Sequence, residues 1–135
     1  MSEGKPPVVV NLSWESGLKF VACDAAQEWV IDGRAESGPT PMQALASGVA
    51  GCMAIDLVHI LTKGRFTVRS LDAELTGTRA DSEPRRFLAI DLRFTIDTDA
   101  PSAQIERAIA LSRDKYCSVW QSLREDIAFT TSFNK

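Results

Sequence analysis

Three cysteines, Cys23, Cys52 and Cys117, are the residues whose chemistry stands out in this chain. A thiolate is a nucleophile and a reductant, so a cysteine in a suitable setting reacts with electrophiles and oxidants. Three widely spaced cysteines do not form the disulfide framework of a small secreted domain, and the sequence contains no CxxC pair. In a reducing compartment, two of them can still form a redox pair that cycles between thiols and a disulfide.

Cys52 lies in the middle of an apolar segment with helical character, so the dipole at a helix N-terminus does not act on it. One interpretation is a buried cysteine that packs as a small hydrophobe. Asp56, one helical turn later, would keep the Cys52 thiol protonated if the carboxylate is close and ionised. A reactive Cys52 therefore needs a cation from elsewhere in the fold or from a second subunit. The candidate cations are ordinary surface arginines by default: Arg34, Arg69, Arg79 and Arg86.

Cys117 follows Lys115 and Tyr116 at the predicted start of a short helix. Free backbone N–H groups and a nearby ammonium would favour its thiolate. The alternative is a packing residue at a corner between helices. Cys23 ends a predicted strand and has no such setting, so we interpret it as structural.

His59 is the one histidine of the chain, seven residues after Cys52. At 1.5 Å per helical residue it lies roughly 10 Å further along the axis, too far to activate that thiol. A packed or surface histidine is the preferred interpretation. One histidine with scattered thiols does not make a zinc site, and we expect no metal.

The bulk properties indicate one soluble domain over residues 1–135. A net charge of −3 provides no basic stripe for nucleic acid. Residues 1–7 lack the cationic and apolar regions of a signal peptide, so we expect a cytoplasmic protein. The apolar stretch 44–61 contains Asp56 and His59, which favours a buried helix over a membrane span.

The pattern predicts an α+β fold. Strands are expected at residues 8–14, 18–23, 28–31, 66–76, 87–98 and 127–133, with a bulge or bend near residues 68–71 of the fourth. Helices are expected at 102–113 and just after Cys117. Thr40 and Gln43 form a capping box that begins a long helix, which should run from Pro41 to about Lys63 and end at Gly64.

That long helix is apolar or small on almost all of its surface. Such a helix is normally central and covered on every side. One short chain can scarcely cover it, so we expect a homodimer in which the two chains share a core.

Two segments resemble the OsmC/Ohr family, and most closely its YhfA-like branch. They are GPTPMQAL followed by GCMAIDLV, at residues 38–45 and 51–58, and RAIALS leading to KYCSV, at residues 107–112 and 115–119. The resemblance implies antiparallel sheets around a long buried central helix in an intertwined homodimer. It also implies a peroxidatic cysteine at Cys52 that attacks an organic hydroperoxide, and a resolving cysteine at Cys117 that closes an intramolecular disulfide. A dithiol reductant would reopen that disulfide, and no metal or organic cofactor is required.

The sequence departs from the peroxidases of that family at two places. They use a glutamate early in the central helix to hold an arginine against the thiolate, and this chain has Met42 and Gln43 there. The family arginine comes from an N-terminal strand region, whereas residues 8–31 contain Lys19 as their only cation. A lysine cannot reproduce the planar fork of a guanidinium. We therefore carry over the two cysteines alone and keep an alternative: a non-catalytic homodimer that binds a small apolar ligand or senses redox state.

Overall fold

The computed structural model of the chain describes residues 4–135. The expectation about residues 1–7 therefore falls partly outside the described residues. Internal contacts group the chain into two compact units, residues 1–45 and residues 46–135. We describe each unit by itself, and the expectation of a single domain stays a prediction.

The first unit contains an antiparallel sheet in the order β1-β2-β3. Its strands are β1 (Asn11–Ser16), β2 (Lys19–Cys23) and β3 (Glu28–Asp32). The predicted turn between the first two strands is present, with Gly17 at a positive φ of 52° that glycine adopts without a side-chain clash. The first strand begins three residues later than predicted, since residues 8–10 are not in a strand.

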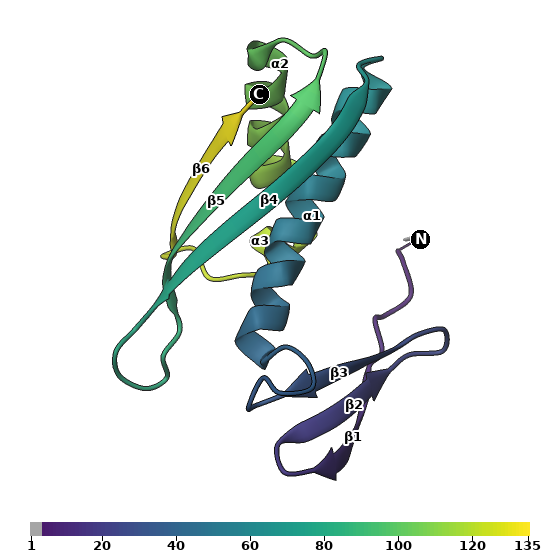
Figure 1. Cartoon of the computed structure of the whole chain (residues 1–135), viewed down its shortest axis with the longest axis vertical. Helices are drawn as coiled ribbons and strands as arrows, with labels where there is room; N and C mark the ends of the chain where they lie inside the picture. Colours follow the sequence, from purple (N-terminus) through teal and green to yellow (C-terminus); the bar gives the residue numbers. More distant parts are fainter. Residues whose placement is uncertain (1–3) are drawn as a thin grey trace. The chain divides into compact units, whose positions relative to one another are not determined.

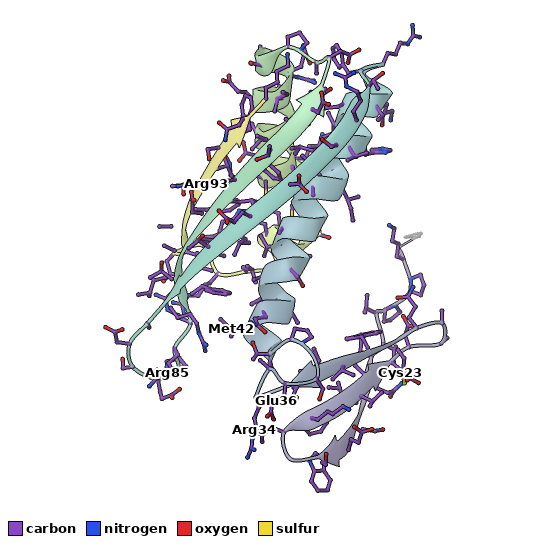
Figure 2. The ribbon with its side chains drawn as sticks, in the orientation of Figure 1. Cys23, Arg34, Glu36, Met42, Arg85 and Arg93 are labelled. Carbon is purple, nitrogen blue, oxygen red and sulfur yellow. The ribbon has the colours of Figure 1, made fainter. Side chains whose placement is uncertain are left out.

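A loop leads from this sheet to helix α1 (Pro41–Lys63). The buried carboxylate of Asp32 accepts hydrogen bonds from the backbone N–H groups of Arg34 and Ser37, at 2.9 and 3.0 Å, and these bonds lower its pKa. The predicted capping box is confirmed. The Gln43 N–H donates to Thr40 Oγ1 at 3.1 Å, and the Thr40 N–H donates to Gln43 Oε1 at 3.0 Å. Side chains of this loop, Arg34 and Glu36, are drawn in Figure 2.

The second unit is a three-stranded sheet with helices on one of its faces (Figure 1). The strands are β4 (Val68–Arg79), β5 (Phe87–Thr98) and β6 (Ala128–Asn134). β5 lies between the other two, antiparallel to β4 and parallel to β6. The predicted irregularity in β4 is confirmed by a register shift between Val68 and Ser70.

The predicted alternation in β5 is confirmed over most of its length. Buried apolar residues from Ile90 to Ile96 alternate with more polar neighbours, while Leu88 is 41% exposed against the pattern. The buried face packs against α1 and helix α2 (Ser102–Leu111). Most of the main core comes from these three elements, and Ala100 and Cys117 complete it: Met53, Leu57, Leu61, Leu92, Phe94, Ile96, Ala100, Ile105, Ala108, Ile109 and Cys117.

Helix α1 is buried on one side only within this chain. Its fully buried residues recur every four positions, at Val49, Met53, Leu57 and Leu61. The opposite side is open, with Ile55 70% exposed and Val58 40% exposed. The prediction of a helix covered on all sides is therefore not met by one copy of the chain.

By length and composition α1 is also apolar enough to cross a membrane, with a mean hydropathy of 1.8. Core helices of soluble proteins share this composition. In this chain α1 carries Asp56 in its second half, and its buried side packs on β5 and α2.

The predicted helix at residues 102–113 ends earlier than expected, at Leu111. The chain continues as a π-helical turn, η1 (Ser112–Tyr116), which leads into the short helix α3 (Ser118–Gln121). The Cys117 N–H donates to the Ser112 carbonyl at 2.7 Å, which closes the wider i to i+5 ring of a π turn. Hydrophobic periodicity does not encode this wider turn, whose first residue also contacts α1 through a hydrogen bond described below.

The capping box provides a test of the local fold. Thr40→Ala removes the hydroxyl that accepts the Gln43 N–H, so the free energy of unfolding should fall by about 1 kcal/mol. Thr40→Ser keeps the hydroxyl and should stay near wild type. Urea denaturation followed by circular dichroism measures both. Equal losses in the two variants would contradict a stabilising cap.

Candidate thiol site

Helix α1 places Cys52 next to the main core. Cys52 is half-buried and packs against the cluster that contains its neighbour Met53. It lies well inside the helix, eleven positions after Pro41, so its own backbone N–H belongs to the helix ladder. The prediction that no helix terminus acts on Cys52 is thus consistent with its position.

Cys117 lies at the N-terminus of α3, as its sequence context predicted. It is the N-cap residue, and its Sγ accepts a hydrogen bond from the Trp120 N–H at 3.3 Å. The Trp120 ring packs on Phe129 of β6 with ring centroids 4.2 Å apart, which holds α3 against the sheet. Cys117 itself is completely buried and is part of the main core.

The fold brings these two cysteines together. The Cys52 and Cys117 side chains are near enough for Cys52 to raise the pKa of Cys117, although 65 positions separate them in the sequence (117 − 52 = 65). Both are free thiols, as is Cys23. Cys23 ends β2 in the first unit, half-buried, and Figure 2 labels it there. The structure therefore places two free thiols in the same region of the second unit, and they are not joined by a disulfide.

The expectation that its setting favours the Cys117 thiolate is wrong. Burial, with smaller contributions from the neighbouring Cys52 and Asp56, raises the pKa of Cys117 from 9.0 to about 11, against the opposing hydrogen bond from the Trp120 N–H. The helix N-terminus is present, but one N–H group does not compensate for removal of the thiolate from water. Lys115 does not help, because its ammonium lies over the Tyr116 ring, 5.2 Å from the centroid.

Asp56 has a partner that the sequence did not reveal. The Ser112 hydroxyl donates to Asp56 Oδ2 at 2.8 Å, and Ser112 is completely buried. Sequence reasoning placed the influence of Asp56 on Cys52, whereas in the structure its charge also raises the pKa of Cys117. The one sequence feature that could have indicated this bond was a serine, Ser112, just after an apolar helical segment, and serines are too common at such positions to be singled out.

Most of the arginines considered as partners of a thiolate are engaged elsewhere. Arg69 pairs with Asp97 at 3.0 Å, and Arg86 pairs with Asp126 at 3.5 Å. Arg79 donates to the Arg85 carbonyl at 2.8 Å. Lysine and arginine are absent from the interactions that shift the Cys117 pKa among the described residues. Arg34 and Lys19 belong to the first unit, where Lys19 pairs with Glu15 at 2.6 Å.

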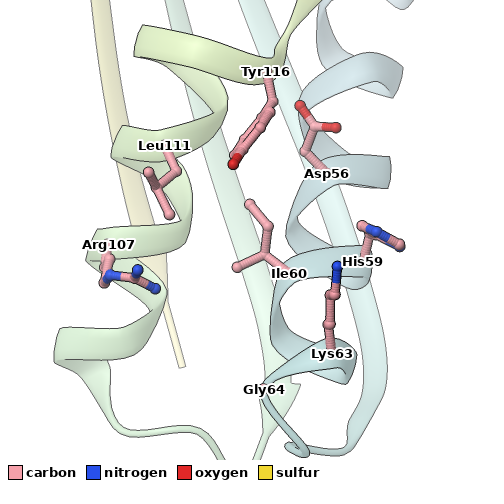
Figure 3. Close-up of a pocket in the computed structure, with 8 residues that line it drawn as sticks. All are labelled: Asp56, His59, Ile60, Lys63, Gly64, Arg107, Leu111 and Tyr116. Carbon is pink, nitrogen blue, oxygen red and sulfur yellow. The ribbon is translucent and has the colours of Figure 1, made fainter.

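A surface pocket of about 530 Å³ adjoins the site through Asp56 and Tyr116 (Figure 3). Exposed His59 contributes to its wall, so the prediction of a packed or surface histidine is confirmed. Neither thiol lines this pocket. Residues 4–135 contain no cluster of three or more His, Cys, Asp or Glu side chains arranged to hold a metal ion.

Comparison with known proteins identifies the family. The family model described as OsmC-like protein matches residues 33–132. The chain belongs to the OsmC-like family. It is 36% identical over 126 residues to protein YhfA of Escherichia coli K12, which covers 91% of this chain and 94% of that protein. The expected resemblance to OsmC/Ohr proteins and to their YhfA-like branch is confirmed.

Solved structures share the fold of this OsmC-like chain. A hypothetical protein from Aquifex aeolicus VF5 matches with a TM-score of 0.88 and 25% identity, over 96% of both chains. An organic hydroperoxide resistance protein OsmC from Legionella pneumophila matches with a TM-score of 0.72 and 13% identity, over 97% of this chain and 100% of that one. The predicted α+β, OsmC-like fold is therefore confirmed.

The raised pKa of Cys117 predicts an alkaline loss of stability. The folded state keeps the Cys117 proton up to about pH 11, whereas the unfolded chain releases it near 9.0. The folded state then binds more protons than the unfolded state, so the free energy of unfolding should fall as pH rises through this window. Urea denaturation of wild type and Cys117→Ala at several pH values measures the effect. The same alkaline slope in both proteins would contradict it.

Proposed function

We propose that this OsmC-like chain is a thiol-dependent reductase of organic hydroperoxides, with Cys52 peroxidatic and Cys117 resolving. The single observation that carries the proposal is the proximity of two free thiols on different elements of the fold, since Cys52 is near enough to raise the pKa of Cys117. The family match supports it, as does the printed description of the Legionella relative as a predicted redox protein and regulator of sulfide bond formation.

The proposed reaction has two steps. The Cys52 thiolate attacks the outer oxygen of the hydroperoxide, the O–O bond breaks, and the alkoxide takes a proton and leaves as the alcohol. Cys52 is then a sulfenic acid. The Cys117 sulfur attacks the Cys52 sulfur, the S–O bond breaks, and the Cys117 proton leaves with the hydroxide as water. A dithiol in the cytoplasm returns two electrons and two protons, which restores both thiols.

Half-burial suits Cys52 to the first step, and full burial suits Cys117 to the second. The attacking sulfur must reach a peroxide from outside, whereas the resolving sulfur needs to reach only Cys52. A neutral Cys117 thiol does not compete for peroxide, because the thiolate is the reactive form. It also stays beside Cys52, where it protects the sulfenic acid from further oxidation.

A stoichiometric addition of cumene hydroperoxide tests the proposal. Wild type should lose two hydrogens in intact mass as the disulfide forms. Cys117→Ser should instead gain one oxygen on Cys52, and Cys52→Ser should consume peroxide at least about a hundredfold more slowly. Cys23→Ser is the matched control and should behave as wild type. Unchanged thiols with no peroxide consumption would exclude the reductase.

A second candidate is a redox-sensing or ligand-binding protein without turnover. The raised Cys117 pKa and the absence of a cation among the interactions that shift it favour this function. Turnover separates the candidates. A sensor forms the disulfide once with peroxide and is reduced slowly, whereas a reductase consumes many equivalents of peroxide in the presence of dithiothreitol.

We also propose that two copies of the chain form a homodimer. Ala22 is the only buried apolar residue among positions 4–45, and the first sheet leaves Leu12, Trp14 and Trp29 exposed. The open side of α1 adds Ile55 and Val58. Exposed apolar surface of this extent is typical of protein interfaces, and a second copy also offers a source for the missing cation.

The homodimer predicts that charges on the open side of α1 dissociate it. Ile55→Lys combined with Val58→Lys places two ammonium groups in the proposed interface, where they lose hydration without gaining a partner. Sedimentation should show a dimer for wild type and a monomer for this variant. Glu106→Lys adds the same side chain to an exposed position on α2 and should leave the dimer intact. A wild-type monomer at micromolar concentration would overturn the proposal.

A further inference from the structure

One hydrogen bond connects the helix that carries Cys52 to the turn that precedes Cys117. The Ser112 hydroxyl donates to Asp56 Oδ2 at 2.8 Å. Asp56 lies four positions after Cys52 on α1, so the two side chains occupy the same face of the helix, one turn apart. Ser112 begins the π turn η1 and is completely buried. The bond thus joins elements that are 56 residues apart in the sequence.

The same serine also holds the backbone of Cys117. The Ser112 carbonyl accepts the Cys117 N–H at 2.7 Å, which is the bond that closes the π turn. Gln121 of α3 closes the segment again, since its side-chain amide donates to the Arg113 carbonyl at 2.7 Å. Ser112 thus binds α1 through its hydroxyl and the Cys117 backbone through its carbonyl, so one residue links Asp56 to the start of α3.

We propose that Asp56 is a positioning residue for disulfide closure, which acts through the Ser112 hydroxyl to hold Cys117 against Cys52. This inference rests on the proposed function, because it assigns a role within the thiol pair. Asp56 does not touch a reacting atom in this scheme. It sets the effective concentration of one sulfur near the other, the quantity on which an intramolecular attack depends.

Asp56 has a second and opposite effect through its charge. The carboxylate is one of the groups that raise the pKa of Cys117, which lowers the fraction of attacking thiolate. Its hydrogen bond therefore accelerates closure and its charge slows closure. The two effects are separable, since an amide at position 56 keeps an oxygen that accepts the Ser112 hydroxyl but carries no charge.

The test measures closure without peroxide, in a Cys23→Ser background. Ellman's reagent converts Cys52 to a mixed disulfide and releases one thionitrobenzoate. Attack of Cys117 on the Cys52 sulfur then forms the protein disulfide and releases a second thionitrobenzoate. The rate of the second release is the closure rate. The variants are Ser112→Ala, Asp56→Ala and Asp56→Asn, each checked by near-ultraviolet circular dichroism.

Positioning predicts a specific order of rates. Ser112→Ala should close about tenfold more slowly than wild type, and Asp56→Ala about tenfold more slowly than the equally uncharged Asp56→Asn, because each removes the hydrogen bond that orients the turn. Asp56→Asn should close as fast as wild type or faster, and the pH profile of its closure should move to lower pH. The double variant Ser112→Ala with Asp56→Ala should close as fast as Ser112→Ala with Asp56→Asn, since both lack the charge and the hydrogen bond.

A wild-type closure rate in folded Ser112→Ala would overturn the inference. Equal closure rates in Asp56→Asn and Asp56→Ala would also overturn it, since the hydrogen bond to a neutral acceptor would then have no positioning effect. If Ser112→Ala does not fold, Asp56→Asn against Asp56→Ala still decides. Failure of the reductase proposal would appear separately, as normal closure with Ellman's reagent but no peroxide consumption by wild type.

Discussion

The buried side of α1 is the constraint on which the second unit depends. Its apolar residues recur every four positions, so one line of contacts runs along the helix and packs on β5 and α2. Because the line is packed in the core, the α1 residues next to it are held at the edge of the core. Cys52 precedes the buried Met53, and Asp56 precedes the buried Leu57, so both polar or reactive side chains lie at the margin of the core. The four-residue spacing of the buried α1 residues therefore also gives the four-residue spacing of Cys52 and Asp56.

Burial is the largest influence on the pKa of Cys117 at the edge of the core. Cys117 occupies a helix N-terminus and accepts an N–H hydrogen bond, two features that ordinarily favour a thiolate. Its pKa nevertheless rises, because the sulfur is enclosed by core residues and faces a carboxylate and a second thiol. In the proposed reaction this division is useful: the accessible sulfur meets the oxidant, and the enclosed sulfur retains its proton until Cys52 has been oxidised.

Local sequence patterns predicted much of this fold, whereas features that depend on contacts between distant segments were not predicted. The capping box at Thr40 and the alternation in β5 arise from neighbours a few residues apart, so the sequence revealed both. The pairing of Cys52 with Cys117 came only from family resemblance, since no local pattern connects them. The bond between Asp56 and Ser112 and the π turn that it accompanies depend on packing of distant segments, and neither was predicted. The direction of the Cys117 pKa shift failed for the same reason: burial is a property of the assembled core.

The π turn η1 inserts one residue more than an α-helical turn between α2 and Cys117. Each residue of an α-helix rotates the chain by about 100°, so this insertion resets the angular phase with which the chain leaves α2. Shortening the segment by one residue would restore regular helix and turn position 117 away from α1. The distance along the chain from Ile109 to Cys117 is therefore under a length constraint that a surface loop, such as the one that joins β4 to β5, does not share. In evolutionary terms, substitutions at the exposed η1 residues Asp114 and Lys115 are more readily accommodated than insertions or deletions in this segment.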